Sequence, residues 1–518
     1  MGTTQPYLML YAIQEHEGWD THLECGAKKL GYRWQARGRV WQDSQRKPAK
    51  NKFEYADGFK TSLIRLAHKK HAIAITSHRY YFEASSKWPT EIPSWRLFPN
   101  GEMPSPLAPS KVISSIKAFH GALTRDDNFL APEPIDLIVS KSNLTNGTKR
   151  IFGKDLREFP LNLSPGTNLS RVGPERNPDN FKLLLCCFSD DPRTLEIYSY
   201  HLKDAFRRMN VYLNLKIIHP KEIQYEINNG SSPVVLFGVN GKKGERLRAE
   251  EASFLDGLDA QRIPYRLFSL DNSALKWSAF DQAGILLESA GGSAYSVRLP
   301  AINSKHPLVF IGLDLGHPKH RKHSWLVATL VNEKGHLIGY WRGKQVRDET
   351  IREKSLVDAL NWCYLTLRKN FAGNYLPLIL RDGRMFQHEK LEVYEPFFNN
   401  GFSFVEVIKH PVPLMITGES CAQEGSFCKP KGSDYDFIVT SRSRNQSQIN
   451  LPLKTRLVHD GLSLGKEVVS DLIVGLCYAP TLGLSPTRSP APIYWSNGLA
   501  AIGETNHQFS GLHHVPHN

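Results

Sequence analysis

Two apolar segments that each run into an aspartate decide the fold: Leu308-Val309-Phe310-Ile311-Gly312-Leu313-Asp314-Leu315 and Leu376-Pro377-Leu378-Ile379-Leu380-Arg381-Asp382-Gly383-Arg384. Each apolar run has the length of a buried strand. Between them, 325–331 and 336–341 are predicted to be two strands joined by the hairpin turn Asn332-Glu333-Lys334-Gly335. Apolar residues then recur at helical spacing from Leu356 to Leu367. The order predicts a strand meander, a helix and a further buried strand.

This order matches the opening of an RNase H-like fold, in which the strands ending at Asp314 and Asp382 are neighbours. Their carboxylates would then converge at one edge of the sheet. Two hard cations, Mg²⁺ or Mn²⁺, need oxygen ligands and a separation of roughly 3.5–4 Å to flank a scissile phosphate. A strand-end aspartate beside glycine is also a common turn former. Two of them on neighbouring buried strands favour the metal site.

The bulk composition of the chain indicates a multidomain α/β protein with a polyanionic partner. Its 518 residues exceed what one core usually supports, so we expect two to four domains. The 65 Lys and Arg against 51 Asp and Glu give a net charge of +14, which suits nucleic acid but also a merely basic enzyme. The chain has no run of 18 apolar residues and no CxxC pair among its seven cysteines. We expect a reduced, cytoplasmic protein without a membrane span.

Changes in sequence texture predict three regions. Residues 1–175 contain short alternating runs, such as 71–76 and 79–82, and favour irregular, β-leaning structure. The polar stretch 163–180 has the composition of a linker. Residues 176–303 alternate strand-like and helical segments, which is typical of a parallel α/β layer, and 304–518 form the RNase H-like domain. The segments behind these assignments are strands at 181–188, 213–218, 233–239 and 402–408, and helices at 194–209 and 464–476.

The two strand ends also resemble a known family. Gly312-Leu313-Asp314 and Arg381-Asp382-Gly383-Arg384 are similar to the PIWI domain of prokaryotic Argonautes, as are Val405-Glu406-Val407-Ile408-Lys409 and Pro490-Ala491-Pro492-Ile493-Tyr494-Trp495-Ser496-Asn497. The resemblance covers about 305–505 well, 180–300 loosely and 1–175 hardly. It implies a Rossmann-like MID domain in 176–303, a PIWI domain in 304–518 and an N-terminal, linker-like region in 1–175. The length implies a compact form without a PAZ domain.

The resemblance also implies a set of catalytic residues. Active members of the family use an Asp, a Glu on a mobile loop, a second Asp and a variable fourth ligand; carried over, these are Asp314, Glu349, Asp382 and Asn497. Asp348 and Glu353 are neighbours that could be confused with Glu349, which could also be a helix-start acid favoured by the helix dipole. Asn497 offers only a neutral oxygen, and a helix N-cap is its other interpretation.

The MID resemblance departs from the family at its phosphate pocket. Arg266 stands where the family often has Gln, and Ser289 stands where it has Lys. Arg266 and Lys276 are the substitute candidates for binding the 5′ end of a guide strand. Surface positions are the alternative for both.

Further basic residues are candidates for phosphate contacts. A basic loop after Asp314 contains Lys319, Arg321 and Lys322. Its histidines, His317, His320 and His323, have the spacing of a transition-metal site but no carboxylate or cysteine partner with matching spacing. The remaining candidates are Arg381, Arg384 and Lys409, with a structural ion pair beside the aspartate as the alternative for the first two.

The favoured hypothesis is a guide-directed endonuclease. A short guide DNA or RNA would pair with a complementary DNA or RNA target, whose phosphate the two metals would hydrolyse, in defence against foreign DNA. The alternative is a catalytically inactive sensor that recruits or activates a separate effector protein. A third interpretation is an RNase H-like transposase or resolvase, because that fold shares the order Asp–hairpin–helix–Asp.

Overall fold

The computed structural model divides the chain into two units by its contacts. The first unit combines 1–144 with 407–457, and the second combines 145–406 with 458–518. The sequence-based boundaries at 175/176 and 303/304 do not coincide with this division. The structure describes residues 6–502 except 14–16, 36–37, 49–52, 67–69, 84–107, 126–128, 142–146, 180, 189–191, 229–232, 241–246, 271–274, 303, 317–322, 349, 387–388, 399–400, 419, 441–450 and 482.

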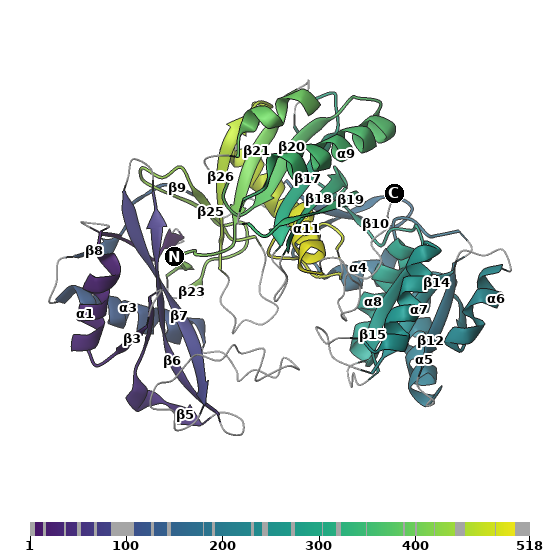
Figure 1. The fold of residues 1–518 in the computed structure, drawn as a ribbon, viewed down its shortest axis with the longest axis horizontal. Coiled ribbons are helices and arrows are strands. Elements are labelled where there is room, and N and C mark those ends of the chain that lie inside the picture. Colours follow the sequence, from purple (N-terminus) through teal and green to yellow (C-terminus); the bar gives the residue numbers. More distant parts are fainter. Residues whose placement is uncertain are drawn as a thin grey trace. The chain divides into compact units, whose positions relative to one another are not determined.

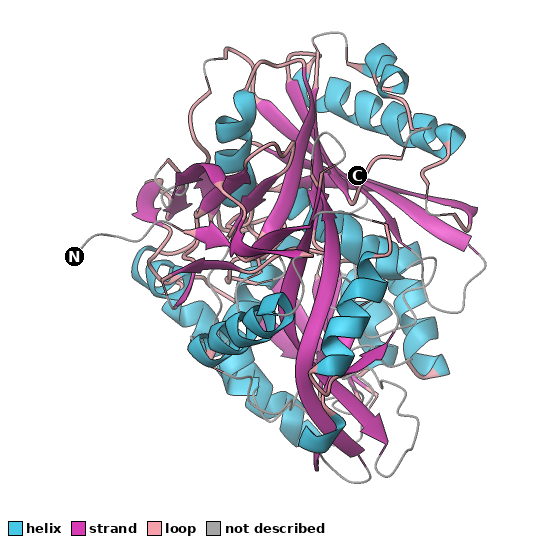
Figure 2. Ribbon diagram, turned by 90° about the vertical axis from the view of Figure 1, so that its left-hand side faces the viewer, coloured by secondary structure: helices cyan, strands magenta, loops and turns pink. Residues whose placement is uncertain are grey.

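The first unit is built on one long antiparallel hairpin, formed by β6 (Phe53–Arg65) and β7 (His71–Glu83). The two strands pair over their whole length, and long strands that run side by side are visible in Figure 2. The alternating runs 71–76 and 79–82 are parts of the single strand β7. The predicted β-leaning character of this region is confirmed, whereas the predicted irregularity is wrong for 53–65 and 71–83, which form two long regular strands.

Both faces of this hairpin are covered. On one face Ile73 and Ile75 pack in a core with apolar residues of helices α1 (Trp19–Lys29) and α3 (Pro109–Arg125). Ala72 and Ala74 point the other way and share a second core with residues of segment 407–457. The sequence did not indicate that this late segment packs in the N-terminal unit.

The remaining elements of the first unit are short. They are β1 (Tyr7–Leu8), β2 (Leu10–Ile13), β3 (Arg33–Gln35), β4 (Arg39–Trp41), η1 (Asp43–Gln45), β5 (Lys47–Pro48), β8 (Leu130–Pro134), β9 (Leu137–Lys141), β22 (Met415–Thr417), β23 (Ser420–Cys421), β24 (Phe427–Pro430) and β25 (Asp436–Ile438). Segment 407–457 is tied in by strand pairing, since β22 pairs with β1 and β24 pairs with β9.

The second unit contains the predicted parallel α/β layer. Its sheet has the order β13-β12-β14-β15 with every pair parallel, and helices α5, α7 and α8 accompany it (Figure 1). The strands at 181–188, 213–218 and 233–239 and the helix at 194–209 are confirmed within two residues. The linker prediction for 163–180 is wrong in part, because Pro165–Val172 form helix α4. Pro165 at the first position of α4 has its backbone φ fixed near the helical value, which favours a helix despite the polar composition of the segment.

The RNase H-like layer of the second unit has the strand order β19-β18-β17-β20-β21. The pairs β19–β18 and β18–β17 are antiparallel and β17–β20 is parallel, as a meander followed by a helical crossover requires. The hairpin turn is fixed by Asn332, whose Oδ1 accepts hydrogen bonds from the Lys334 and His336 backbone N–H groups. Gly335 supplies the left-handed conformation, with φ 86°.

The elements of the second unit are β10 (Lys149–Phe152), β11 (Arg157–Pro160), α4 (Pro165–Val172), β12 (Lys182–Cys187), α5 (Pro192–Arg208), β13 (Asn214–Ile217), η2 (Pro220–Glu222), α6 (Ile223–Asn228), β14 (Val234–Val239), α7 (Ala249–Ala260), β15 (Tyr265–Ser269), α8 (Leu275–Ser289), β16 (Ser296–Arg298), β17 (Leu308–Gly316), β18 (His323–Asn332), β19 (Leu337–Val346), α9 (Glu353–Phe371), β20 (Leu376–Asp382), η3 (Leu391–Val393), η4 (Glu395–Phe397), α10 (Gly465–Leu476) and α11 (Ala491–Ile502). Strands β21 (Ser403–Ile408) and β26 (Leu453–Asp460) contain the points where the chain passes from one unit to the other. No helix in the described part of the chain is long and apolar enough to span a membrane.

Candidate catalytic site

The register of β17 and β20 places Asp314 and Asp382 side by side. The two strands are parallel, and their last recorded pair is Leu313 with Arg381, so the next residue on each strand is one of the two aspartates. Residues in register on neighbouring parallel strands point to the same face, about 4.8 Å apart. Asp314 is 8% exposed and Asp382 is half-buried. Two carboxylates therefore leave the sheet together at one strand end.

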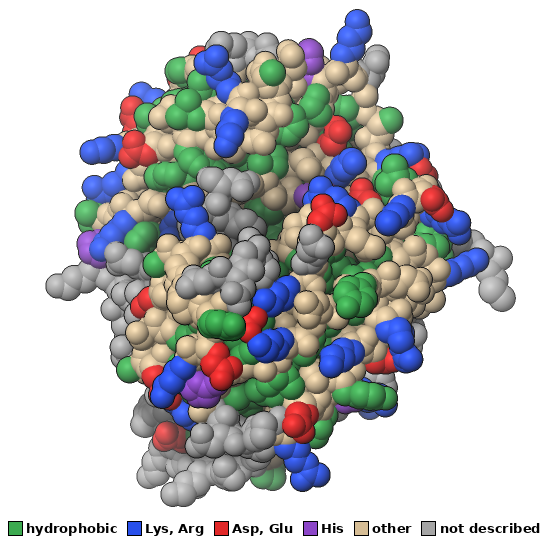
Figure 3. Space-filling model, turned by 90° about the vertical axis from the view of Figure 1, so that its right-hand side faces the viewer, with side chains coloured by type: hydrophobic (Ala, Val, Ile, Leu, Met, Phe, Trp, Pro, Cys, Tyr) green, Lys and Arg blue, Asp and Glu red, His purple; other side chains and the backbone are tan. Residues whose placement is uncertain are grey.

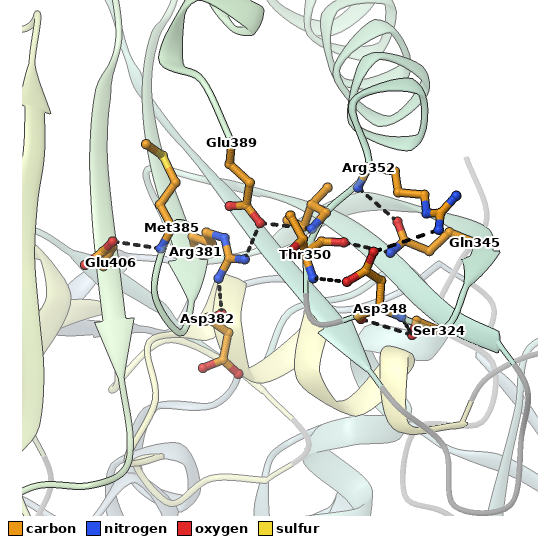
Figure 4. A network of polar contacts seen from close by, with 11 residues as sticks. Ser324, Gln345, Asp348, Thr350, Arg352, Arg381, Asp382, Met385, Glu389 and Glu406 are labelled. Atoms are coloured by element: carbon orange, nitrogen blue, oxygen red, sulfur yellow. Dashed lines mark hydrogen bonds and ion pairs between the residues drawn. The ribbon is translucent and has the colours of Figure 1, made fainter. Parts of the chain in front are cut away.

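The face that carries the aspartates is the one opposite α9. Ile311 and Leu313 pack in a core with Leu360 and other residues of α9, so residues 312, 314 and 316 point the other way. On β20, Ile379 belongs to the same α9 core, which directs Asp382 to the face of Asp314. Figure 4 shows the Asp382 carboxylate directed away from the Arg381 guanidinium, as this alternation requires.

Helix α11 lies directly on that face because β17 has glycine on either side of Asp314. A Cβ at Gly312 would stand 2.3 Å from Pro492 O, and one at Gly316 would stand 2.5 Å from Ala500 O. Eight helical residues rise about 12 Å and four strand residues extend about 13 Å, so helix and strand run alongside each other. Asp314, midway between the glycines, lies opposite the middle of this stretch of α11.

Asn497 belongs to that middle stretch. It is exposed, and it is the seventh residue of α11, which begins at Ala491. The alternative interpretation as an N-cap is therefore wrong. The helix begins earlier than we expected because Pro492 occupies its first turn, where proline is tolerated. Thr329 Oγ1 donates to Pro492 O at 2.9 Å and fixes this end of α11 on β18.

The donor set suits a hard cation. Asp314 and Asp382 offer carboxylate oxygens, and Asn497 would offer its amide oxygen, which are the ligand atoms that Mg²⁺ and Mn²⁺ prefer. Among the described residues, no three His, Cys, Asp or Glu side chains are grouped closely enough to hold a metal ion. Glu349, the expected third carboxylate, lies outside the described residues, as do His317, His320, Lys319, Arg321 and Lys322. The described chain thus provides the two carboxylates in register, while Asn497 stays a predicted third ligand on α11.

Of the two acids near Glu349, Asp348 takes part in backbone contacts. Its Oδ1 accepts from the Thr350 N–H at 3.2 Å, and its backbone exchanges hydrogen bonds with Ser324 Oγ. Glu353 is the first residue of α9. These contacts give Asp348 a local structural role, and Glu353 has the first-turn position that the helix dipole favours for an acid.

Arg381 is buried in an ion pair. Its Nη2 lies 2.8 Å from Glu389 Oε1, and the two side chains are 4% and 2% exposed. Its Nη1 donates to the Asp382 carbonyl oxygen at 3.0 Å. This geometry favours the structural alternative for Arg381 over a phosphate contact. Arg384 is exposed and Lys409 is half-buried.

Two buried acids near Asp382 were missed in the sequence. Glu406 Oε1, on the fully buried strand β21, accepts from the Met385 N–H at 2.7 Å. A lone acid inside an apolar strand is a signal that could have found Glu406. Glu389 lies in a polar segment that gives no such signal, and only its contacts reveal it.

Comparison with known proteins rests on structure alone. No family model matches the chain, and no curated protein matches its sequence. Solved structures do match. Drosophila Piwi has a TM-score of 0.68 and 12% identity, with 100% of this chain and 90% of that chain covered. Marinitoga piezophila Argonaute, solved with 5′ OH guide RNA and target DNA, has a TM-score of 0.65 and 11% identity, with 96% and 86% covered. Kluyveromyces polysporus Argonaute, solved with a guide RNA, has a TM-score of 0.60 and 11% identity, with 90% and 75% covered.

The chain has an Argonaute fold. The parallel layer of β12–β15 is then the MID layer, and the layer with Asp314 and Asp382 is the PIWI layer. The exact limits that we expected for these domains stay predictions. Since the matches cover nearly the whole chain, the fold also includes the N-terminal unit, where the sequence had shown little resemblance.

In the MID layer, the two residues that depart from the family pattern touch each other. Arg266 lies on β15, is 6% exposed, and donates from Nε to Ser289 Oγ at 3.1 Å. Burial lowers the pKa of Arg266 to about 10. Burial also raises the pKa of the adjacent Glu288 to about 7, against the opposing effect of His336 and Arg266.

Lys276, the other MID candidate, lies in the first turn of α8 and is exposed. Ser289 ends the same helix, thirteen residues further on. At 1.5 Å per residue the two positions are about 20 Å apart along the helix axis. The structure therefore does not bring Lys276 and Arg266 together into one pocket.

Proposed function

We propose that this protein binds a short guide oligonucleotide and cleaves a complementary nucleic-acid strand in a metal-dependent reaction. The observation that carries the proposal is the register of Asp314 and Asp382, which places two carboxylates on one face of the PIWI layer under α11. Two neighbours with this fold were solved with guide RNA, one of them with target DNA as well. Defence against foreign DNA and a cytoplasmic location remain part of the proposal.

The residues of the chain have separate roles in this reaction. Asp314 and Asp382 hold the cations, Glu349 supplies a third carboxylate, and Asn497 contributes a neutral oxygen from α11. Two Mg²⁺ or Mn²⁺ ions, when bound, supply an activated water and stabilise the leaving 3′ oxygen. The α11 backbone packs closely on Gly312 and Gly316, and Asp314 between them is 8% exposed.

Nucleic acid would be held mainly by electrostatic contacts. The net charge of +14 supports this, and Arg384, Lys276 and Lys409 are exposed or half-exposed candidates. On the face drawn in Figure 3, basic side chains are dispersed among acidic and apolar ones rather than gathered into a stripe. Affinity should therefore come from many weak phosphate contacts, with base pairing to the guide supplying specificity.

The test is cleavage of a labelled target by purified protein with Mn²⁺ and a complementary guide. DNA and RNA are used for both strands, and each guide carries either a 5′ phosphate or a 5′ hydroxyl. We expect a single cut that Asp382→Ala abolishes and that a chelator prevents. Asp358→Ala, an exposed acid on α9, is the matched control and should cut like the wild type. Absence of cutting by the wild type, or equal cutting by both variants, contradicts the proposal.

A second candidate function is supported by the neutral Asn497. With an uncharged fourth ligand the site has lower metal affinity, which suits a sensor that binds guide and target and then recruits or activates an effector protein. The sensor would bind the duplex without metal-dependent cutting and co-purify with a partner. The transposase or resolvase interpretation is disfavoured, because the Argonaute fold extends over nearly the whole chain.

A further inference from the structure

The strand end that carries Asp382 is connected to the start of α9 through one buried carboxylate. Glu389 Oε1 accepts from Arg381 Nη2 at 2.8 Å and from the Ile351 backbone N–H at 2.9 Å. Arg381 in turn donates from Nη1 to the Asp382 carbonyl oxygen at 3.0 Å. A single side chain thus joins two segments of the PIWI layer that are about thirty residues apart in sequence (Figure 4).

The segment that Glu389 reaches is also held from β19. Gln345 Nε2 donates to Thr350 O at 3.0 Å, and Gln345 Oε1 accepts from the Arg352 N–H at 3.3 Å. Three consecutive residues, 350 to 352, therefore each have a backbone group fixed by a buried side chain. Gln345 and Glu389 are 5% exposed, so water competes little for these hydrogen bonds.

The turn after Asp382 is fixed on its other side. Gly383 has a φ of 87°, the left-handed conformation that reverses the strand, and the Met385 N–H donates to the buried Glu406. Asp382 is thus flanked by a residue that Glu389 holds and by a turn that Glu406 holds. Such support matters because a metal ligand must be kept within about 0.5 Å of its productive position.

We propose that Glu389 is a positioning residue: through Arg381 and the Ile351 N–H it sets the Asp382 carboxylate relative to the segment that begins α9, and thereby sets the affinity of the site for divalent metal. Glu389 touches no reacting atom, since its side chain lies on the α9 face and Asp382 points to the α11 face. This role rests on the proposed function, because it presumes that Asp382 is a metal ligand.

Mn²⁺ binding measured by calorimetry on the full chain, without nucleic acid, tests the role. Glu389→Gln keeps the shape but removes the charge that binds Arg381. We expect it to weaken Mn²⁺ binding by about 10–100-fold, as loss of residues that orient metal ligands does. Glu392→Gln, an exposed acid three residues away, is the matched control and should bind Mn²⁺ like the wild type.

A double variant separates positioning from stability. Breaking a buried ion pair is costly, whereas replacing both partners by apolar residues is often neutral. Arg381→Met with Glu389→Met should therefore regain the melting temperature lost in Glu389→Gln while its Mn²⁺ binding stays weak. Hydrogen exchange at the Ile351 amide should be accelerated in both variants.

The outcomes distinguish this role from the nuclease proposal. Mn²⁺ affinity of Glu389→Gln equal to that of the wild type, or full recovery of Mn²⁺ affinity in the double variant, overturns the positioning role. Absence of Mn²⁺ binding by the wild type overturns it as well. A wild type that binds Mn²⁺ but does not cleave contradicts the nuclease proposal and leaves the binding comparison to decide the role of Glu389.

Discussion

Two places in the second unit have charged residues that we predicted to be functional, one in the PIWI layer and one in the MID layer. They differ in the contacts that the neighbouring helix makes with those residues. In the PIWI layer, β17 has glycine on both sides of Asp314, so α11 packs its backbone on the strand and the two aspartates keep a common face. In the MID layer, β15 presents Arg266 to the end of α8, where Ser289 accepts its hydrogen bond. The first strand end places two carboxylates on one face, whereas at the second the guanidinium of Arg266 donates a hydrogen bond to a neutral hydroxyl.

The difference shows that a charged residue at a strand end has no fixed meaning. In the PIWI layer the strand register brings the carboxylates of Asp314 and Asp382 to one face of the sheet, and both would attract a divalent cation. Arg266 already has a hydrogen-bond partner in Ser289 and an acid nearby in Glu288. The same contrast exists within the PIWI layer, where Asp382 and the adjacent Arg381 point to opposite faces of the sheet. Arg381 is buried in an ion pair with Glu389, whereas Asp382 is half-buried at the proposed metal site.

The largest expected effect concerns two buried arginines, Arg381 and Arg266. Arg381→Ala leaves Glu389 as an uncompensated buried charge, and we expect a loss of about 3–5 kcal/mol in the free energy of unfolding. Arg266→Ala should cost clearly less, because Ser289 is neutral and the raised pKa of Glu288 lets that acid take up a proton. Urea unfolding of the two variants at pH 7 makes the comparison. Equal losses of unfolding free energy would mean that Arg266, like Arg381, compensates the charge of a buried ionised acid.

The next effect concerns the glycines that bring α11 onto β17. Gly312→Ala places a methyl group 2.3 Å from Pro492 O, and we expect a loss of about 1–3 kcal/mol together with impaired Mn²⁺ binding. The matched substitution in the MID layer is Gly257→Ala, an exposed position in α7 with open space around it. That variant should gain about 0.5–1 kcal/mol through helix propensity. Denaturant unfolding measures both free energies. If Gly312→Ala leaves the free energy of unfolding unchanged, α11 can move away from β17.

Much of this architecture could be predicted from the sequence, because it depends on local pattern. The strands predicted at 308–315, 325–331 and 376–380 are confirmed within two residues, whereas the second hairpin strand, predicted at 336–341, extends to Val346. The parallel register that aligns Asp314 with Asp382 follows from the same order of elements. These features depend on residues that are near one another in the chain or on a topology shared by the fold.

What could not be predicted depends on contacts between distant residues. The Glu389 contact with Ile351 spans 38 residues, and nothing in the local composition distinguishes Glu389 from the exposed Glu392. The packing of segment 407–457 in the first unit joins residues hundreds of positions apart. The burial of Arg266 depends on the hydroxyl of Ser289, and the sequence showed only that both differ from a family pattern.

A smaller effect is expected at position 497, where the PIWI face has a neutral ligand. Asn497→Asp adds a third negative charge to the two strand-end carboxylates without changing the shape of the side chain. The added charge should strengthen Mn²⁺ binding by about tenfold, because affinity for hard cations rises with the charge of the ligand set. Calorimetric titration of wild type and variant measures this. Unchanged affinity would place position 497 outside the metal site and would remove the support that Asn497 gives to the sensor interpretation.

The smallest effect concerns the pH dependence of the MID layer. Burial raises the pKa of Glu288 to about 7 from its usual value near 4.5, so the folded chain holds a proton that the unfolded chain has released. The free energy of unfolding should therefore fall as pH rises from about 4.5 to about 7, and the penalty should then stay constant. Glu288→Gln removes the titration, so the difference in stability between variant and wild type should grow over that interval to about 1 kcal/mol, a value reduced for partial exposure.

His336 and Arg266 also influence this acid, and comparing the two proteins at each pH cancels their own contributions as long as both retain the same contacts. A difference that does not change between pH 4.5 and 7 would show that Glu288 is ionised throughout, held as an ion pair with Arg266. The MID strand end would then resemble the Arg381–Glu389 pair of the PIWI layer, and the contrast between the two regions would rest on the aspartates alone.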